Sequence, residues 1–202
     1  MACMDDLCRA FTPKPGVRYV YTALNDKGLE RAAEFTPPLS PKAHEYSTRV
    51  DMCDVFAQRN TNRTQAQQMA SWPKMVEKAI AKGAKEGGMN ISNPFGSNWI
   101  GQVPTEKLMA MFDRMVQAWN DAGITVTRIG FSDATGWNMP HQVERTLEEV
   151  KKRWPSITDF NLHLHNARGA ALASIYASLR VLDATDTLRV QTAIGGMAGC
   201  PY

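Results

Sequence analysis

Residues 159–182 read DFNLHLHNARGAALASIYASLRVL and join two stretches of different periodicity. Residues 159–164 alternate polar and apolar side chains, as a strand does, whereas residues 167–182 place apolar side chains at helical spacing. A strand followed by a helix is the unit from which parallel sheets are built. This stretch therefore predicts one strand–helix unit near the end of the chain.

The same unit repeats toward the N-terminus. Further strands are expected at residues 17–24, 50–57, 88–93, 125–132 and 188–194. Further helices are expected at residues 27–34, 64–82, 104–122 and 140–153, with loops at 36–41 and 58–68. Successive strands start 29 to 38 residues apart, which is the length of one strand plus one helix. The pattern predicts an α/β fold with about six βα units and a parallel sheet.

Two architectures fit such a pattern, the (β/α)₈ barrel and the doubly wound open sheet. The sequence has no G-x-G-x-x-G and no G-x-x-x-x-G-K-[ST], which are the phosphate loops of doubly wound nucleotide binders. A barrel needs eight units and about 250 residues, whereas six units account for all 202 residues. The pattern leaves a six-stranded α/β domain or part of a barrel with both ends missing. In either case we expect a single domain over residues 1–202.

Composition excludes several classes of protein. The net charge of +3 comes from 23 basic and 20 acidic residues without a basic run, which argues against nucleic acid as a partner. The N-terminus carries acids where a secretory signal needs bases, and no apolar run approaches membrane-spanning length. Four scattered cysteines indicate a reducing compartment. We therefore expect a cytoplasmic protein that binds neither nucleic acid nor membrane.

Residues able to carry chemistry gather at predicted strand ends. His163 and His165 are two apart on a strand, so they project from the same face. They lie at the carboxyl end of that strand, where parallel α/β folds build their sites. Two imidazoles there can supply two neighbouring ligands to a divalent metal. The alternative is a pair of polar residues hydrogen-bonded at a strand end.

Two further stretches are candidates. Asp133 follows the apolar strand at 125–132, and it is either a site carboxylate or an Asx-turn or helix-capping residue. Residues 195–202 read GGMAGCPY, and such a glycine-rich loop lets backbone approach a ligand. Cys200 within it is either a catalytic acid or nucleophile, or inert. We expect the remaining cysteines to be inert: Cys3, Cys8 and Cys53.

Together these stretches resemble the DRE-TIM metallolyases, and within them the hydroxymethylglutaryl-CoA lyase-like branch. Residues 132–136 (SDATG) resemble the family's strand-six motif, and His163-Leu164-His165 resembles its strand-seven H-x-H. Residues 199–202 (GCPY) match the end of its strand-eight glycine loop. The resemblance implies an incomplete TIM (β/α)₈ barrel whose six units correspond to strands three to eight.

Some of the family's functional residues have no counterpart in the sequence. These are the strand-one Arg-Asp pair, the strand-two Glu and the Asn that follows the G-C-P-Y loop. We therefore expect the chain to be a fragment of an active enzyme, and to be inactive or nearly so by itself. The resemblance implies a divalent cation, Mg²⁺ or Mn²⁺, held by His163, His165 and ligands outside this chain.

The resemblance also implies the reaction. A 3-hydroxy-3-methylglutaryl-CoA-like substrate would be cleaved to acetyl-CoA and a keto acid by retro-Claisen chemistry, so the partner is a small acyl-CoA, and a homodimer is compatible with it. The implied catalytic residues are Cys200 and Asp133, and the implied substrate-binding residues are Gly196, Gly199 and Asn166. Asn166 stands where the family commonly has Asp.

Three alternatives to the lyase remain open. One is a Claisen-condensing acyltransferase of the isopropylmalate or homocitrate synthase type. Those enzymes carry a G-E-R-x-G-N loop where this sequence has Gly-Cys-Pro-Tyr at 199–202, which favours the lyase. Another is a retro-aldol or carboxyl-transfer relative that acts on a 2-oxo acid. The last is an inactive fragment that acts only as a binding or structural subunit.

Overall fold

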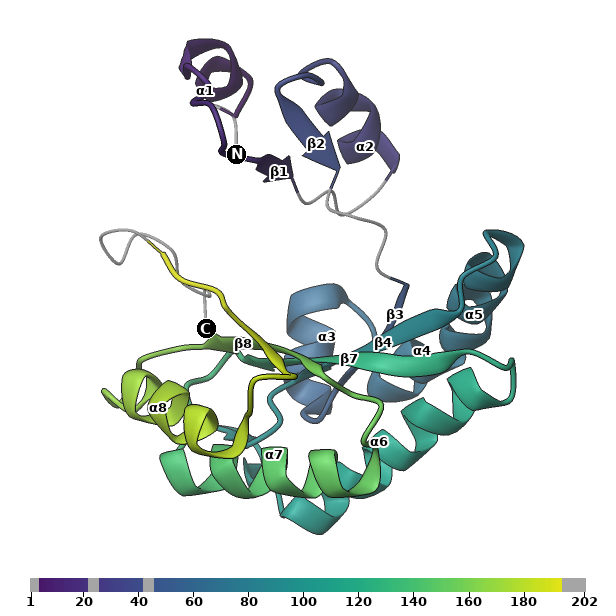
Figure 1. Cartoon of the computed structure of the whole chain (residues 1–202), viewed down its shortest axis with the longest axis vertical. Coiled ribbons are helices and arrows are strands. Elements are labelled where there is room, and N and C mark those ends of the chain that lie inside the picture. The colour runs from purple at the N-terminus through teal and green to yellow at the C-terminus, as the bar shows by residue number, and fades with distance from the viewer. Residues whose placement is uncertain (1–3, 22–25, 42–45, 194–202) are drawn as a thin grey trace. The chain divides into compact units, whose positions relative to one another are not determined.

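The computed structural model describes residues 4–21, 26–41 and 46–193. The chain divides into two compact units, Met1–Glu45 and Tyr46–Tyr202 (Figure 1). The prediction of one domain over residues 1–202 stays a prediction. Among the described residues, every helix is too short or too polar to span a membrane.

The first unit is a small βαβ arrangement preceded by a helix. It contains α1 (Met4–Ala10), β1 (Tyr19–Tyr21), α2 (Asp26–Ala33) and β2 (Leu39–Pro41). The predicted strand at 17–24 and helix at 27–34 are thus present, in shorter or shifted form. The predicted loop at 36–41 is partly wrong, since β2 forms there and pairs in parallel with β1. In a βαβ unit the two consecutive strands commonly pair with each other in parallel.

The second unit is built on a five-stranded parallel sheet with the order β3-β4-β7-β8-β9. Its strands are β3 (Ser47–Asp51), β4 (Glu86–Ser92), β7 (Thr125–Asp133), β8 (Asp159–Leu164) and β9 (Thr187–Val190). A short antiparallel hairpin, β5 (Gly96–Ser97) with β6 (Gly101–Gln102), follows β4. Its helices are α3 (Asp54–Thr61), α4 (Gln65–Ala70), α5 (Trp72–Ala81), α6 (Thr105–Asn120), α7 (Pro140–Arg153) and α8 (Ala171–Val181).

The strand order distinguishes the two architectures that the sequence left open. Each strand of the large sheet lies beside the one before it, and the order never reverses. A doubly wound sheet reverses its order at a switch point, whereas a barrel adds each strand on the same side. In Figure 1, α6, α7 and α8 lie along one face of the sheet. The second unit is therefore arranged as part of a barrel.

The sheet has an apolar face and a polar face. One row across it joins Val50, Ile91, Phe131 and Leu162 by register, and all four side chains are at most 2% exposed. They belong to a core that α5, α6 and α7 complete with Trp72, Val76, Leu108, Phe112, Met115, Val143, Leu147 and Val150. Side chains alternate along a strand, so the residues between these positions face the opposite way.

The predicted strand at 50–57 is only partly right, since a strand forms at residues 47–51. The strand ends at Asp51, and α3 begins at Asp54. Asp51 Oδ1 accepts the backbone N–H of Cys53 at 2.8 Å, and Cys53 Sγ accepts the N–H of Phe56 at 3.4 Å. These contacts satisfy backbone amides at the start of α3, so the chain turns into a helix after Met52.

The predicted loop at 58–68 and helix at 64–82 are also revised. Most of that loop is helical, since α3 runs to Thr61 and α4 begins at Gln65. Thr64 and Gln67 form a reciprocal capping box at the start of α4, the motif that marks a helix start. The long helix is divided at Ser71, because Pro73 near the start of α5 lacks the N–H that would continue α4.

Candidate functional site

A row of polar side chains crosses the carboxyl edge of the large sheet. Register places Asp51 beside Ser92, Ser92 beside Ser132, and Ser132 beside His163. These four residues alternate with the buried apolar row, so they lie on the polar face. The carboxyl edge of a parallel sheet is where α/β proteins place ligands, and this row is the candidate site.

The two predicted histidines lie together at this edge. His163 is in β8 and His165 follows it, and their Nε2 atoms are 3.2 Å apart. Two nitrogen ligands at about 2.1 Å from one cation, in neighbouring positions, are roughly 3 Å apart. The separation in this structure therefore fits two imidazoles that share one divalent cation.

The ionisation of His165 also suits cation binding. Burial lowers the pKa of His165, the neighbouring His163 lowers it further, and the Asp133 carboxylate opposes both effects. A neutral imidazole offers a lone pair to a metal, whereas a protonated one does not. The pair supplies two donors only, because no group of three or more His, Cys, Asp and Glu side chains gathers anywhere in the described part of the chain.

His163 is oriented by its neighbours on the sheet. Its Nδ1 atom lies 2.6 Å from Gln191 Oε1, and Gln191 Nε2 donates to Asn161 Oδ1 at 3.3 Å. The backbone N–H of Gln191 donates to Leu162 O at 2.9 Å, which continues the β8–β9 pairing past the end of β9. Gln191 was not predicted as a site residue, because no sequence motif marks it.

Asp133 is fully buried and its carboxylate holds a turn. Oδ1 accepts the N–H of Trp137 at 3.0 Å, and Oδ2 accepts the backbone and side-chain N–H groups of Asn138 at 2.8 and 2.6 Å. Burial raises the pKa of Asp133, and the bonds from Asn138 and Trp137 oppose that rise. The geometry anchors residues 133–138, and a catalytic role for Asp133 stays a prediction.

Asn138 connects this turn to the second histidine. Besides binding Asp133, its amide donates to the backbone carbonyl of His165 at 3.0 Å and accepts from Ser174 Oγ of α8 at 2.8 Å. The backbone of His165 is therefore tied to both the β7 turn and α8. No local pattern in the sequence marks Asn138, since these partners are 27 and 36 residues away.

A second polar network joins the ends of the other strands. Asn93 donates to Asp51 Oδ1 at 3.1 Å and accepts from Thr135 Oγ1 at 3.0 Å. Burial raises the pKa of Asp51 to about 6, against the opposing effect of the bonds from Asn93 and Cys53. This network fixes the segments that follow β3, β4 and β7 relative to one another.

Of the other predicted site residues, the structure describes only Asn166. Asn166 is exposed, and its Oδ1 accepts the N–H of Ala171, the first residue of α8, at 3.0 Å. Its proposed contact with substrate stays a prediction. The remaining three lie outside the described residues: Gly196, Gly199 and Cys200.

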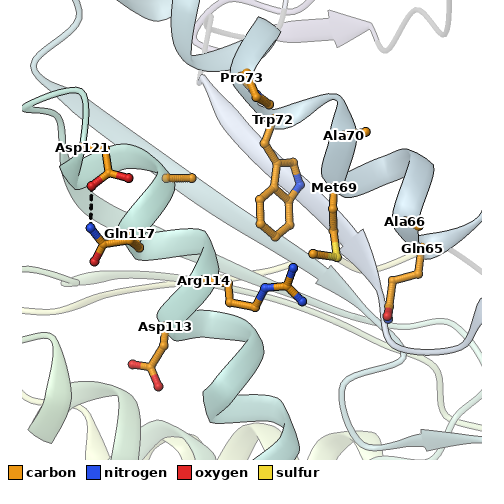
Figure 2. Close-up of a pocket in the computed structure, with 11 residues that line it drawn as sticks. Gln65, Ala66, Met69, Ala70, Trp72, Pro73, Asp113, Arg114, Gln117 and Asp121 are labelled. Atoms are coloured by element: carbon orange, nitrogen blue, oxygen red, sulfur yellow. Dashed lines mark hydrogen bonds between the residues drawn. The ribbon is translucent and has the colours of Figure 1, made fainter.

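A pocket of about 960 Å³ lies elsewhere, between α4, the start of α5 and α6. Figure 2 shows the Arg114 side chain extending from α6 toward Met69 and Trp72. The acids at its rim have partners, since Asp113 pairs with Arg153 at 3.8 Å and Asp121 accepts from Gln117. None of the sequence-predicted site residues that the structure describes lines this pocket, so the polar edge of the sheet remains the candidate site.

Comparison with known proteins gives a consistent result. The family model described as HMGL-like matches residues 7–187. The chain is 26% identical to hydroxymethylglutaryl-CoA lyase YngG of Bacillus subtilis over 98% of its length and 60% of the relative. It is 25% identical to the human cytoplasmic 3-hydroxy-3-methylglutaryl-CoA lyase, over all of this chain and 50% of that protein.

A solved structure supports the fold. The crystal structure of the Bacillus subtilis HMG-CoA lyase aligns with a TM-score of 0.68 and 24% identity, over 100% of this chain and 62% of that one. Together with the strand order, this likeness confirms the predicted incomplete (β/α)₈ barrel. The chain spans 50 to 60% of the length of the two curated relatives named above.

Proposed function

Because the chain belongs to the HMGL-like family of DRE-TIM proteins, we propose that it forms the cation-binding side of a carbon–carbon lyase site. The observation that carries the proposal is the 3.2 Å separation of the Nε2 atoms of His163 and His165. It occurs at the carboxyl edge of the sheet, on the polar face. A pair of half-buried imidazoles in that position offers two nitrogen donors to a cation.

The proposed substrate is a 3-hydroxy-3-methylglutaryl-CoA-like thioester in the cytoplasm, cleaved to acetyl-CoA and a keto acid. Support comes from the relatives, since the Bacillus subtilis and human proteins are hydroxymethylglutaryl-CoA lyases by name. The proposal extends their reaction to this chain, which matches only part of each.

The proposed cofactor is Mg²⁺ or Mn²⁺, held by His163 and His165. When bound, it would supply Lewis acidity that lowers the pKa of the substrate's 3-hydroxyl and so permits retro-Claisen cleavage of the adjacent carbon–carbon bond. Nitrogen donors suit Mn²⁺ better than Mg²⁺, which prefers oxygen. Mn²⁺ is therefore the cation of choice for experiments.

The chain's own side chains prepare the site. Asn138 holds the backbone of His165 through its bond to the carbonyl, and Asp133 holds Asn138. Fixed ligands lose less entropy when a cation or substrate binds. Asp133 is proposed to belong to the proton-transfer network of the hydroxyl, Cys200 to protonate the enolate carbon, and the loop with Gly196 and Gly199 to contact substrate with Asn166.

The test is product formation with a sensitive readout. The purified chain is incubated with 3-hydroxy-3-methylglutaryl-CoA and Mn²⁺, and acetyl-CoA is quantified by mass spectrometry, with chelator as the blank. We expect slow release that needs Mn²⁺ and is lost in His163→Ala and His165→Ala. The proposal fails if the folded chain binds no Mn²⁺, or if acetyl-CoA release is unaffected by the chelator and by both substitutions.

A further inference from the structure

The side chain of Gln191 bridges two residues of β8. Leu162 pairs with Val190 by register, so the next residues along each strand, His163 and Gln191, are neighbours. The backbone N–H of Gln191 donates a hydrogen bond to Leu162 O at 2.9 Å. Its side chain lies on the same side as Asn161 and His163, and contacts both.

The bond to Asn161 determines which end of the Gln191 amide faces the imidazole. Asn161 Oδ1 can only accept a hydrogen bond, so the Gln191 Nε2 group points toward it at 3.3 Å. Oε1 then points toward His163 Nδ1, 2.6 Å away. An amide oxygen carries no proton, so Nδ1 of His163 must be the donor in this contact.

This contact fixes the tautomer of His163. A neutral imidazole carries one N–H, and when that proton is on Nδ1 the lone pair is on Nε2. Nε2 is the atom that faces His165 Nε2 across 3.2 Å. Histidines that bind metals commonly donate their other ring N–H to an oxygen, which fixes tautomer and ring orientation.

From this geometry we infer that Gln191, oriented by Asn161, is a positioning residue that holds His163 with its Nε2 lone pair toward the cation position. This inference rests on the proposed function, which assigns a divalent cation to that position. Gln191 itself is not expected to touch the cation or the substrate. It acts through His163, so its removal should change the tautomer of His163 and the affinity for a cation.

The experiment combines two readouts. The first is the pair of imidazole ¹⁵N shifts of His163 in the cation-free chain, at a pH where both histidines are neutral, which report the protonated nitrogen. The second is Mn²⁺ affinity from electron paramagnetic resonance titration. The variants are Gln191→Leu, which removes the acceptor, and Gln191→Glu, which retains it. Gln117→Leu makes the same chemical change on α6 and serves as the control.

We expect the wild-type chain and Gln191→Glu to show Nδ1–H and a lone pair on Nε2. Gln191→Leu should show a mixture of both tautomers and bind Mn²⁺ about ten- to a hundredfold more weakly, whereas Gln117→Leu should match the wild type. If Gln191→Leu does not fold, Asn161→Ala takes its place, because it frees the Gln191 amide and should also mix the tautomers.

The outcomes separate this inference from the proposed function. If the variant that folds keeps the single Nδ1–H tautomer and a Mn²⁺ affinity within twofold of wild type, the inference is overturned. If the tautomer depends on Gln191 while no variant, wild type included, binds Mn²⁺, the orienting role stands and the proposed cation site is refuted.

Discussion

Asn138 gives both its backbone N–H and its side-chain N–H to one carboxylate oxygen, Asp133 Oδ2, at 2.8 and 2.6 Å. The carboxylate is fully buried, so these bonds replace the water that it loses on folding. The same Asn138 amide also bonds to the backbone carbonyl of His165. A structural tie between the end of β7 and the candidate cation ligands thus passes through these two residues.

Replacing Asn138 by Ala should destabilise the chain strongly. The change removes one of the donors to Asp133, the acceptor of Ser174 Oγ and the donor to His165 O. Leaving several buried polar groups without partners costs about 2–4 kcal/mol of unfolding free energy. Urea denaturation followed by circular dichroism measures this loss. Asn120→Ala, at an exposed position on α6, is the control and should stay within about 0.5 kcal/mol. Equal stability of the two variants would contradict the anchoring role.

Asp51 should make the stability of the fold depend on pH in mildly acidic solution. Burial raises its pKa from 3.8 to about 6, so the folded state binds this proton more tightly than the unfolded state. The resulting stabilisation is complete below about pH 4 and is lost as pH rises through 6. At 1.36 kcal/mol per pKa unit, the loss is at most about 3 kcal/mol.

The comparison that isolates this effect is between wild type and Asp51→Asn. Unfolding free energies are measured from pH 4 to pH 7, and the difference between the two proteins is plotted against pH. Relative to the variant, the wild type should lose stability as pH increases. A difference that is constant over this range would show that Asp51 keeps an ordinary pKa.

Cys53 should matter as a helix cap and not as a reactive thiol. It is 0% exposed, and its Sγ accepts the N–H of Phe56 at the start of α3. Cys53→Ala removes that acceptor and should cost about 1 kcal/mol, whereas Cys53→Ser retains one and should cost less. Thermal or urea unfolding ranks the variants, with Cys8→Ala in the first unit as the control. The account is wrong if the Ala and Ser variants at position 53 are equally stable.

The sequence was sufficient to predict strands and helices where local periodicity determines them. The strands around residues 88–93, 125–132 and 159–164 and the helices at 104–122 and 140–153 all form close to their predicted positions. The two histidines were predicted to share a face because side chains alternate along a strand. That expectation needs no knowledge of the rest of the fold, and their 3.2 Å Nε2 separation agrees with it.

Prediction from the sequence failed where contacts between residues far apart in the chain determine the structure. The apolar residues 50–57 look like a strand, but a thiol cap and the Asp51 carboxylate begin a helix there. The partners of the polar networks are far apart in the chain, with Asn93 and Thr135 separated by 42 residues and His163 and Gln191 by 28. No local pattern marks such residues, because their roles exist only after the sheet has brought strand ends together.

The central claim is that His163 and His165 bind one divalent cation together. Its most direct test is a Mn²⁺ titration of the purified chain, followed by electron paramagnetic resonance, for the wild type, His163→Ala, His165→Ala and the exposed control His141→Ala. We predict one saturable Mn²⁺ site that is weak, because the described residues offer two donors at this position. It should be lost in both site variants and kept in His141→Ala. Saturable binding that survives either site substitution, or no binding by the folded wild type, would contradict the account.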